Sequence, residues 1–579
     1  MMGKTIEKKI QEGMYPVRQV TDLKDILNSS AELYGDRTAY LYKKKLGGDY
    51  LPISFQQVRE DVEALGTALA GQGLSGLRIG VIGENRYEWV ISYLAVANGL
   101  GVVVPLDREL PAHEIAALME RAELSALIYS SKVEQKITEA LSQVEREVLL
   151  ISMDSDRRQG ETLSLSELMQ IGRQRIKDGD RQYIDAAVDP ERMSMLLFTS
   201  GTTGLAKGVM LCHRNIASNI YNMSRYVDLT VRQGQQIGLS MLPMHHTYEF
   251  TCTIMASFYQ GATIAFCEGL KYIVKNMEEA KVTYMIAVPL VFENMHQKIW
   301  KQAEKSGKAD KMRKAIRMIR TLSYIDKKIQ KRTMRLFKEV HAALGGHVRL
   351  MVAGAAPINP NVINDFNAMG ITMLQGYGMT ECSPIIALNP DQCARASAAG
   401  LPLPGTEIRI FEPDENGIGE IICKSESVML GYYKDPEETA NVIRDGWLYT
   451  GDYGYFDKDG YVYITGRKKN VIVTKNGKNI FPEEVEYYLN QSPFIAEVVV
   501  GGEKEDETGE SVVWASIYPD HETILEQKGV LGEEELKALL KAEIDRLNEQ
   551  MPFYKRVKRF RIRETEFDKT TTRKIKRWS

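Results

Sequence analysis

Twelve consecutive residues, LFTSGTTGLAKG at positions 197–208, combine hydroxyl groups, glycines and one lysine. Glycine lets backbone N–H groups approach an anion without a Cβ atom in the way, and hydroxyl groups add further donors. A lysine adds a point charge that attracts phosphate. The residues expected to surround the anion are Thr199, Ser200, Gly201, Thr202, Thr203, Gly204 and Lys207. The segment predicts a phosphate-binding loop, and a surface loop of turn-forming residues is the alternative.

The loop does not fit the Walker pattern of P-loop NTPases, G-x-x-x-x-G-K-[ST]. Counting five positions from Gly201 places Ala206 where the pattern requires glycine. Lys207 is then followed by Gly208, so no serine or threonine is available there for Mg²⁺. The P-loop NTPase class is therefore excluded.

Two later segments are each expected to be a strand that ends in a polar turn. VRLMVAGAAP ends in the turn at Gly354–Pro357, and ITMLQGYGMTECSP carries Tyr377, Thr380 and Glu381. In open α/β sheets, ligands lie beyond the carboxyl ends of strands, so the two turns are expected to line one crevice. Tyr377 offers a flat face to a nucleobase, and Glu381 offers oxygen to Mg²⁺.

Two histidines follow an apolar strand in LSMLPMHHTYEF. A metal site at His245 and His246 would need further ligands, but Glu249 is the only carboxylate close by and no H-E-x-x-H is present. The histidines are therefore interpreted as lining a site. Farther along, Asp452 follows Thr450 and Gly451, where a carboxylate could accept two hydrogen bonds from a ribose diol. A solvated turn aspartate is the other interpretation.

The bulk composition describes an ordinary globular chain. With 579 residues, 44% hydrophobic and 26% charged, and a formal net charge of -3, it is too long for one core and its charge indicates no particular partner. Six cysteines without C-x-x-C or zinc spacing favour reduced thiols in the cytoplasm. The N-terminus lacks an apolar run, and the stretch Trp89–Leu106 is too interrupted to span a membrane. A buried helix that leads into a strand is expected there.

Helical periods alternate with short β-branched runs from about Leu23, which predicts parallel α/β layers. GVIGEN at 80–85 lacks the dinucleotide spacing G-x-G-x-x-G. From Gly405 short strands and turns predict a small β-rich unit, and an α+β module follows. The predicted organisation is an N-terminal domain at 1–466, with a β-rich subdomain at about 405–466, and a small mobile C-terminal domain at 467–579.

Residues 301–338 hold fourteen Lys or Arg and three acidic residues, with Met312, Ile316 and Ile319 at helical spacing, and a later set at Met334, Phe337 and His341. Such a helix could lie on an anionic membrane surface, and a solvated face on a helical hairpin is the alternative. The basic C-terminal tail, from Tyr554, lacks interleaved stacking aromatics, so nucleic acid is not an expected partner.

The order of seven segments resembles the adenylate-forming superfamily, which contains acyl-CoA synthetases, luciferases and peptide-synthetase adenylation domains. The segments are TSGTTGLAKG, LPMHHTY, GAAP, LQGYGMTE, YTGD, ITGRKKN and the terminal TTTRKIKR. The resemblance covers nearly the whole chain, and seven segments in order at plausible spacing would arise very rarely by chance. The sequence is identified as a member of this superfamily.

The resemblance implies a role for each matching position. Residues 199–207 resemble the loop that holds pyrophosphate, Thr380 an α-phosphate contact and Glu381 the magnesium carboxylate. His246 resembles the catalytic-site histidine beside the acyl pocket, although the preceding His245 is unusual. The positions that resemble the adenine site are Gly354, Ala355, Ala356, Pro357, Gln375, Gly376, Tyr377 and Gly378.

Other matching positions lie near the C-terminus. Asp452 and Arg467 resemble the ribose clamp, Lys469 the hinge position, and Lys574 the catalytic lysine of the C-terminal domain. The glycine that usually precedes that lysine is replaced by Arg573, and the usual proline before Lys569 is replaced by Asp568. These departures concern the local loop geometry more than the role of the lysine.

The implied reaction has two steps. A carboxylate attacks the α-phosphorus of ATP, with Mg²⁺, to give acyl-AMP and pyrophosphate, and the thiol of coenzyme A then attacks the acyl carbon. In the family the C-terminal domain rotates between the steps. The basic excursion before VRLMVAGAAP and the ending TTTRKIKR resemble bacterial long-chain fatty acid ligases more than peptide-synthetase domains.

The sequence therefore predicts a free-standing fatty acid–CoA ligase in the cytoplasm, with a peripheral contact to the inner membrane surface as a further hypothesis. Two alternatives keep the first step and change the acceptor: an acyl-carrier-protein ligase, and an acyl-AMP ligase that never uses coenzyme A. A third is a membrane-associated binding protein with a vestigial adenylating site. The intact Glu381, Asp452 and Lys574 argue against this third alternative.

Overall fold

A computed structural model describes residues 13–199, 206–230, 234–323, 333, 336–473, 479–504, 511–569 and 575–577. The chain divides into two compact units. Unit 1 consists of residues 1–407 and 424–446, and unit 2 consists of residues 408–423 and 447–579. The domain boundary at residue 467 stays a prediction, because the β-rich strands and the C-terminal elements fall together in unit 2.

An eight-stranded sheet in unit 1 carries the hairpin that holds the glycine-rich segment. Its strand order is β19-β9-β8-β4-β3-β5-β6-β7. From β8 to β7 all neighbours are parallel, whereas β9 and β19 are added antiparallel at one edge. The strands are β3 (Arg78–Ile82), β4 (Val102–Pro105), β5 (Ala126–Tyr129), β6 (Leu149–Ser152), β7 (Leu163–Ser164), β8 (Met193–Thr199), β9 (Lys207–Cys212) and β19 (Gly431–Tyr432).

A nine-stranded sheet in unit 1 carries the two strand-end turns. Its order is β16-β15-β14-β13-β12-β10-β11-β1-β2, and β14, β13, β12, β10, β11 and β1 are parallel. The carboxyl ends of these parallel strands therefore lie at one edge of the sheet. The strands are β1 (Thr38–Tyr42), β2 (Leu51–Ser54), β10 (Ile237–Ser240), β11 (Thr263–Phe266), β12 (Tyr284–Ala287), β13 (Leu350–Ala353), β14 (Thr372–Gly378), β15 (Ile385–Leu388) and β16 (Leu401–Pro402).

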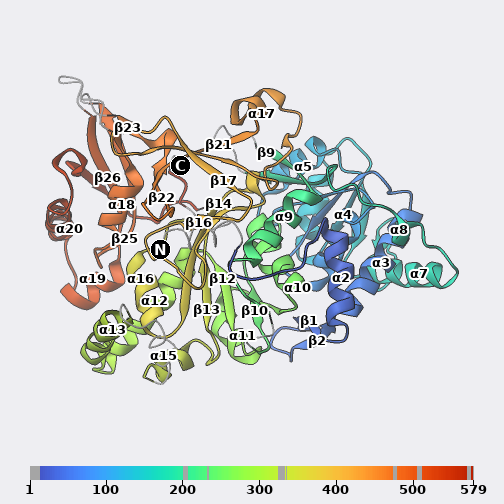
Figure 1. Cartoon of the computed structure of the whole chain (residues 1–579), viewed down its shortest axis with the longest axis horizontal. Coiled ribbons are helices and arrows are strands. Elements are labelled where there is room, and N and C mark those ends of the chain that lie inside the picture. Colours follow the sequence, from blue (N-terminus) through green and yellow to red (C-terminus); the bar gives the residue numbers. More distant parts are fainter. Residues whose placement is uncertain are drawn as a thin grey trace. The chain divides into compact units, whose positions relative to one another are not determined.

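Helices connect the parallel strands, as the alternating sequence pattern predicts (Figure 1). The predicted buried helix after Trp89 is confirmed, since α4 is covered on all sides and leads into β4. The helices of unit 1 are α2 (Leu23–Tyr34), α3 (Phe55–Gly71), α4 (Tyr87–Ala97), α5 (Ala112–Arg121), α6 (Glu134–Leu141), α7 (Leu165–Lys177), α8 (Gln182–Asp185), α9 (His213–Ser224), α10 (Ala256–Gln260), α11 (Ile273–Glu279), α12 (Pro289–Lys305), α13 (Ala309–Ser323), α15 (Lys338–Ala343), α16 (Pro360–Ala368) and α17 (Pro436–Val442).

Local sequence explains why these helices form where they do. Ser54 caps α3 by accepting a hydrogen bond from the backbone N–H of Gln57, and apolar residues at helical spacing on α3 are fully buried. The predicted amphipathic helix in the basic excursion is confirmed as α13, which buries Met312, Ile316 and Ile319 in the core under the nine-stranded sheet. Met334 lies outside the described residues.

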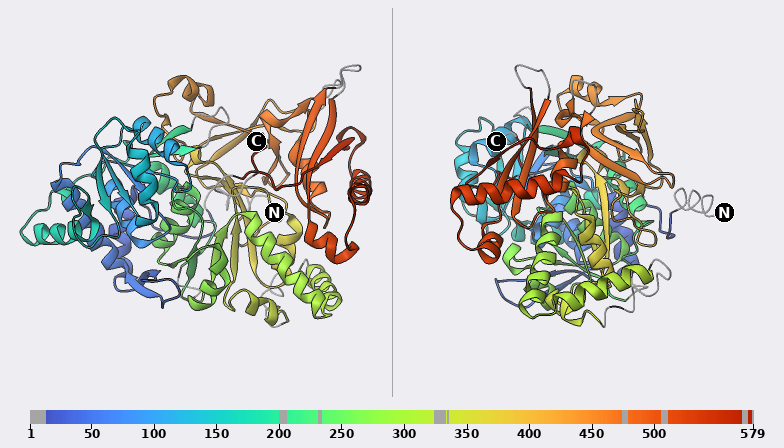
Figure 2. Two further views of the ribbon diagram at one scale, coloured as in Figure 1. Left: turned by 180° about the vertical axis from the view of Figure 1, so that it is seen from behind. Right: turned by 90° about the vertical axis from the view of Figure 1, so that its left-hand side faces the viewer.

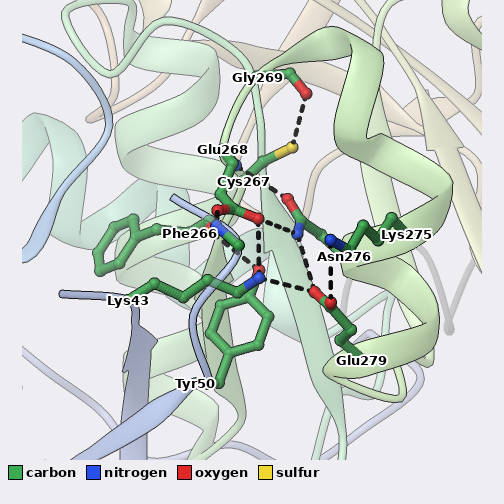
Figure 3. Close-up of polar contacts among 10 residues, drawn as sticks. Lys43, Tyr50, Phe266, Cys267, Glu268, Gly269, Lys275, Asn276 and Glu279 are labelled. Carbon is green, nitrogen blue, oxygen red and sulfur yellow. Dashed lines mark hydrogen bonds and ion pairs between the residues drawn. The ribbon is translucent and has the colours of Figure 1, made fainter. Parts of the chain in front are cut away.

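A buried ion-pair cluster fixes the outer part of the nine-stranded sheet (Figure 3). Lys43 Nζ, just after β1, lies 2.7 Å from Glu268 Oε2 and 2.7 Å from Glu279 Oε2 of α11. Asn276 donates hydrogen bonds to both carboxylates. Burial alone would raise the pKa of Glu268, but the hydrogen bonds from Lys43 and Gly47 hold that pKa at about 2. The cluster ties β1, β11 and α11 together.

Unit 2 contains short antiparallel strands and an α+β module, as predicted. β18 pairs with β21, and β21 pairs with β22. α18 and α20 cover the sheet of β25, β26 and β27 (Figure 2). The elements are β17 (Glu407–Phe411), β18 (Gly419–Lys424), β21 (Trp447–Phe456), β22 (Val462–Arg467), β23 (Ile472–Val473), β24 (Asn479–Ile480), α18 (Pro482–Leu489), β25 (Ile495–Lys504), β26 (Ser511–Pro519), α19 (His521–Lys528), α20 (Glu533–Asn548) and β27 (Arg559–Ile562).

Within the described residues, every helix is too short or too polar to cross a lipid bilayer.

Candidate active site

The glycine-rich segment connects β8 to β9 in an antiparallel hairpin. Thr199 at the end of β8 lies opposite Lys207 at the start of β9, and the Thr199 hydroxyl lies 3.5 Å from the carbonyl oxygen of Lys207. Ser200, Gly201, Thr202, Thr203 and Gly204 lie outside the described residues. The hairpin therefore fixes the two ends of the predicted loop and brings Lys207 to the base of the turn.

Among the described residues, the ammonium group of Lys207 lies close to one carboxylate and one aromatic ring. It forms an ion pair and hydrogen bond with Glu438 of α17, and it lies 5.1 Å from the ring centroid of Tyr432. The hydrogen bond from Lys207, followed by one from Asn441, lowers the pKa of Glu438. Lys207 thus already contacts an anionic group.

Tyr432 also contacts Glu381. Its hydroxyl donates a 2.8 Å hydrogen bond to Glu381 Oε1, and burial together with this carboxylate raises the pKa of Tyr432. β19, which carries Tyr432, pairs with β9, which carries Lys207. One tyrosine therefore links the predicted phosphate-binding lysine to the predicted magnesium carboxylate, although 174 positions of sequence, from 207 to 381, separate them.

The turn that holds Thr380 and Glu381 is fixed from behind by Asn219 of α9. The Asn219 carboxamide donates to the carbonyl oxygens of Cys382 and Ile385, and it accepts a hydrogen bond from the N–H of Ile385. Asn219 is fully buried, so its hydrogen bonds are shielded from water. Thr380, Glu381 and Cys382 form one short 3₁₀ turn.

The turn after β13 requires a glycine. A Cβ atom on Gly354 would come 2.6 Å from the hydroxyl of Tyr248, which also lies 3.3 Å from the carbonyl oxygen of Val352. Ala355 then adopts a left-handed conformation with φ of 70°. Ala356 is half-buried and Pro357 is exposed. The backbone at residues 354–357 is thus turned sharply at the carboxyl end of the sheet.

The second turn follows β14, the neighbour of β13. A Cβ atom on Gly378 would come 1.8 Å from the carbonyl oxygen of Pro384, so only glycine fits there. The Gln375 side chain donates a hydrogen bond to the carbonyl oxygen of Ala398. Gly376 is half-buried and Tyr377 is buried. β13 and β14 are parallel neighbours, so the two predicted adenine-site turns emerge side by side.

His245 and His246 lie in the turn between β10 and a π-helix at Tyr248–Met255. Their ring centroids are 4.0 Å apart. Burial, and to a lesser degree Arg108, lowers the pKa of His245 to about 3, so its imidazole is neutral. Its Nε2 lies 3.6 Å from Asp107 Oδ2, beyond hydrogen-bond distance, and has no hydrogen-bond partner among the described residues. A neutral imidazole at this place is an uncharged polar group close to Asp107 and His246.

In unit 2, Asp452 and Arg467 lie opposite each other on β21 and β22. Arg467 Nε lies 2.7 Å from Asp452 Oδ1, and the Asp452 carboxylate is buried. A second pair has the same form, with Lys468 Nζ 2.6 Å from Glu420 Oε2. The Glu420 carboxylate also accepts a hydrogen bond from the N–H of Gly451. Both acids lie on strands, Arg467 is the last residue of β22, and Lys468 begins the short turn that follows.

Lys469 follows in a short 3₁₀ turn at Lys468–Asn470, where burial and the charge of Arg467 lower its pKa. Lys574 lies outside the described residues, which resume at Ile575 after a gap that begins beyond Lys569. Lys569 and Ile575 form an antiparallel bridge, and Arg577 Nη2 lies 2.5 Å from Glu486 Oε2 of α18. The tail that carries Lys574 is therefore anchored on both sides to the C-terminal module.

The sequence analysis missed Tyr432, Glu438 and Asn219. Tyr432 and Glu438 both lie in GYYKDPEET, a segment that begins with β19. The spacing of aromatic and acidic residues in this segment does not indicate that they lie against the glycine-rich hairpin. Asn219 is one polar residue in a helix. Among the described residues, no group of three or more His, Cys, Asp or Glu side chains could hold a metal. Glu381 Oε2 has no hydrogen-bond partner in the part of the chain that is described.

Comparison with known families finds a match over most of the chain. The family described as AMP-binding enzyme matches residues 27–433, and the AMP-binding enzyme C-terminal domain matches residues 469–578.

Two similar relatives are mammalian enzymes. Long-chain-fatty-acid–CoA ligase 5 of Rattus norvegicus is 31% identical over 523 residues, which cover 83% of this chain and 73% of the relative. Long-chain-fatty-acid–CoA ligase 1 of Cavia porcellus is 32% identical, covering 84% of this chain and 72% of the relative. The crystal structure of the anthranilate CoA ligase AuaEII with anthranoyl-AMP has a TM-score of 0.75 at 20% identity, covering 97% of this chain and 96% of that one. That likeness shows the fold.

Proposed function

Because this chain belongs to the AMP-binding family of adenylate-forming enzymes and is similar to its long-chain fatty acid–CoA ligases, we propose that it converts a fatty acid to its acyl-CoA thioester. ATP is consumed in the first step, which forms acyl-AMP and releases pyrophosphate. Coenzyme A accepts the acyl group in the second step. The observation that carries this proposal is the match to long-chain ligases at 31–32% identity over more than four-fifths of the chain.

The roles of residues in unit 1 follow from their positions at strand ends. Residues 199–207 hold the β- and γ-phosphates, and Lys207 neutralises part of their charge. Thr380 contacts the α-phosphate, and His246 lies beside the acyl carboxylate. Adenine binds along the turns after β13 and β14, at Gly354, Ala355, Ala356, Pro357, Gln375, Gly376, Tyr377 and Gly378. The sharp backbone at Gly354 and Gly378 supports this assignment, since neither position admits a side chain.

In unit 2, the Asp452 carboxylate and Arg467 bind the ribose hydroxyls. The Asp452 carboxylate is buried on β21 and contacts Arg467, and a carboxylate can accept hydrogen bonds from both hydroxyls of a diol. Lys574 brings positive charge to the adenylation step. Lys469 is the hinge of a C-terminal domain that begins at residue 467, and its position in a turn between two short β-elements supports that role.

The residues on this chain suit Mg²⁺ at Glu381. Mg²⁺ binds through one or two carboxylates together with phosphate oxygens, and Glu381 has one oxygen that Tyr432 does not use. When bound, Mg²⁺ would offset the repulsion between the attacking carboxylate and the α-phosphate. The Tyr432 hydroxyl orients the Glu381 carboxylate, and Asn219 holds the turn that carries it.

The direct test is pyrophosphate release with a panel of acids, from acetate through long-chain fatty acids to aromatic acids. We expect long-chain fatty acids to give the highest kcat/KM. A higher value for short or aromatic acids would contradict the substrate class, and no release with any acid would support a vestigial site. Adding coenzyme A or an acyl carrier protein to the same assay identifies the acceptor, because only the true acceptor converts acyl-AMP onward.

We also propose that residues 301–338 contact an anionic membrane surface from the cytoplasmic side. The outer face of α13 carries five basic residues and one acidic residue between 309 and 323. The six cysteines, all of them among the described residues, form no disulfide bond, which suits a reducing compartment. Cosedimentation with vesicles that contain phosphatidylglycerol should fall as salt rises, because exposed charges are screened. Salt-independent binding would contradict an electrostatic contact.

A further inference from the structure

A cavity of about 930 Å³ lies between α12, α13 and α16 of unit 1, and none of its lining residues is assigned to the nucleotide or to the reaction. The three helices contact one another, and Figure 1 shows them side by side. The lining of the cavity includes Arg313, Arg317 and Arg320 of α13, Trp300 of α12 and Asn361 of α16. A volume of this size accommodates a small organic ligand.

The spacing of α13 explains why three arginines face one cavity. Met312, Ile316 and Ile319 turn inward and are buried in the core. Arg313, Arg317 and Arg320 each come one residue after one of these buried residues, so they lie together on a neighbouring stripe of the helix. Lys311 lies on the other side of the buried stripe and does not line the cavity. The three arginines that lie beside the buried stripe of α13 therefore line the cavity.

The acids in and beside the lining pair with Arg313 and with His296. Glu304 and Asp310 both contact Arg313, at 3.3 Å and 2.9 Å. Asp365 lies 2.9 Å from His296 Nε2. The guanidinium group of Arg317 makes no hydrogen bond or ion pair with the described residues, although it lines the cavity. The cavity therefore offers an unsatisfied, planar, bidentate donor beside an aromatic ring.

We propose that this cavity binds the phosphate headgroup of an anionic glycerophospholipid at a bilayer surface. Arg317 contacts the phosphate as a fork of two N–H donors, with Arg320 and the Asn361 carboxamide beside it. Trp300 and Ile316 provide the apolar wall that the glycerol and first acyl carbons require. Arg313 lies with its guanidinium 5.6 Å from the Trp300 ring centroid and keeps that ring in place. A headgroup is favoured because the cavity combines cationic and apolar walls, as the boundary of a bilayer does.

The proposal rests on the proposed function in one respect: a fatty acid is apolar and partitions into bilayers, so an enzyme that binds a headgroup draws its substrate from the surface it occupies. It goes beyond the membrane contact proposed above by naming one ligand site. Diffuse attraction acts on every cation near the surface, wherever it lies on the helix. A headgroup site acts only through the cations that line the cavity.

Two substitutions of equal charge separate these explanations. Arg317→Gln removes a cavity cation, and Lys311→Gln removes an exposed cation of the same helix that does not line the cavity. Partitioning of the full chain onto phosphatidylcholine vesicles with phosphatidylglycerol is measured for both variants. Lys311→Gln should weaken partitioning about fivefold, the contribution of one basic residue near such a surface. Arg317→Gln should weaken it about tenfold more, because a charged hydrogen bond is lost as well.

Equal losses in the two variants would overturn the headgroup site. Pyrophosphate release with a water-soluble medium-chain acid should stay at the wild-type level in both variants, since neither residue is assigned to catalysis. A wild-type chain that releases no pyrophosphate would contradict the proposed function alone, and the vesicle result would still decide the cavity.

A soluble probe distinguishes a lipid from a free phosphate compound. Dihexanoyl phosphatidylglycerol, glycerol 3-phosphate and inorganic phosphate are each titrated into the wild-type chain and into Trp300→Phe, and tryptophan fluorescence is recorded. We expect a saturable change with the short-chain lipid that is absent in Trp300→Phe. The same change at the same concentration of inorganic phosphate would overturn the lipid assignment, and so would a lipid response that persists in Trp300→Phe.

Discussion

Two regions of this chain pair acids with cations at residues assigned to the nucleotide, and they do so in opposite ways. In unit 1, the Lys207 and Glu438 side chains are 24% and 30% exposed, so both partners meet water. In unit 2, the Asp452 and Glu420 side chains are only 5% and 6% exposed, whereas Arg467 and Lys468 are 43% and 56% exposed. The first arrangement can exchange its acid for another anion. The second buries its acids and holds its cations at the more exposed side of each pair.

The physical reason lies in desolvation. An exposed ion pair contributes between zero and about 1 kcal/mol to the stability of the fold, so replacing its acid by a phosphate costs little free energy. A buried acid that loses its cation keeps a charge away from water, which costs about 3–5 kcal/mol. The comparison therefore assigns different tasks: unit 1 presents a cation to an incoming anion, and unit 2 presents fixed acceptors to hydroxyl groups.

The largest expected effect on activity concerns Lys574 in the C-terminal tail of the chain. Lys574→Ala should slow acyl-AMP formation by about 100- to 1000-fold, by analogy with the loss of one transition-state donor. Conversion of supplied acyl-AMP to the thioester should continue. Single-turnover assays of each step measure both rates, and Lys576→Ala serves as the control from the same tail. Equal loss of both steps would contradict a lysine that serves adenylation alone.

Glu249 of unit 1 is a buried acid that accepts hydrogen bonds from hydroxyl groups, and it shows how burial shifts a pKa when no cation among the described residues is paired with the acid. Burial raises the pKa of Glu249 from 4.5 to about 8, against the hydrogen bonds from Ser240 and Thr253. The folded state therefore holds a proton that the unfolded state releases, and stability falls as pH rises from about 4.5 to about 8. We expect Glu249→Gln, which stays neutral, to remove a change of roughly 5 kcal/mol in the free energy of unfolding across that window.

The measurement is the denaturation midpoint of both proteins near either end of the window. Tyr248, Tyr284, Cys252 and Cys267 are the other titratable groups around this carboxyl, and all of them remain in the variant. All four have pKa values above this window, so an unchanged slope in Glu249→Gln would contradict the raised pKa of this carboxyl.

The next effect separates the two buried acids of unit 2. Asp452→Asn should raise the KM for ATP by an amount worth about 1.5–3 kcal/mol, because it weakens hydrogen bonds between a charged acceptor and the ribose. Glu420→Gln changes an equally buried acid that holds Gly451 and Lys468, and it should lower the denaturation midpoint with less effect on the KM. Similar KM values for the two variants would contradict a specific ribose contact by Asp452.

The smallest effect tests the exchangeable acid of unit 1. Glu438→Gln should lower the KM for ATP by up to about fivefold, since removing an exposed ion pair worth up to about 1 kcal/mol frees Lys207 for phosphate. Glu437→Gln changes the same charge one position earlier, on an exposed side chain, and should leave the KM unchanged. A higher KM in Glu438→Gln would show that this acid positions Lys207 for ATP.

The sequence by itself determined the fold class, the order of the segments and the identity of the residues assigned to chemistry. Strand and helix periods depend on neighbouring residues, so α3, α4 and α13 could be predicted from spacing alone. The sequence also predicted the turns that contain Gly354 and Gly378. The structure shows that a Cβ atom at either position would clash with its neighbours.

Only the tertiary structure decided which of these residues share partners. Tyr432 contacts both Lys207 and Glu381 because β19 adds to the edge of a sheet whose other strands come from the first 212 residues, and no local pattern encodes that pairing. The arginine-lined cavity likewise arises where three helices meet. Spacing fixes which face of a helix is apolar, but packing of distant segments decides what each face meets.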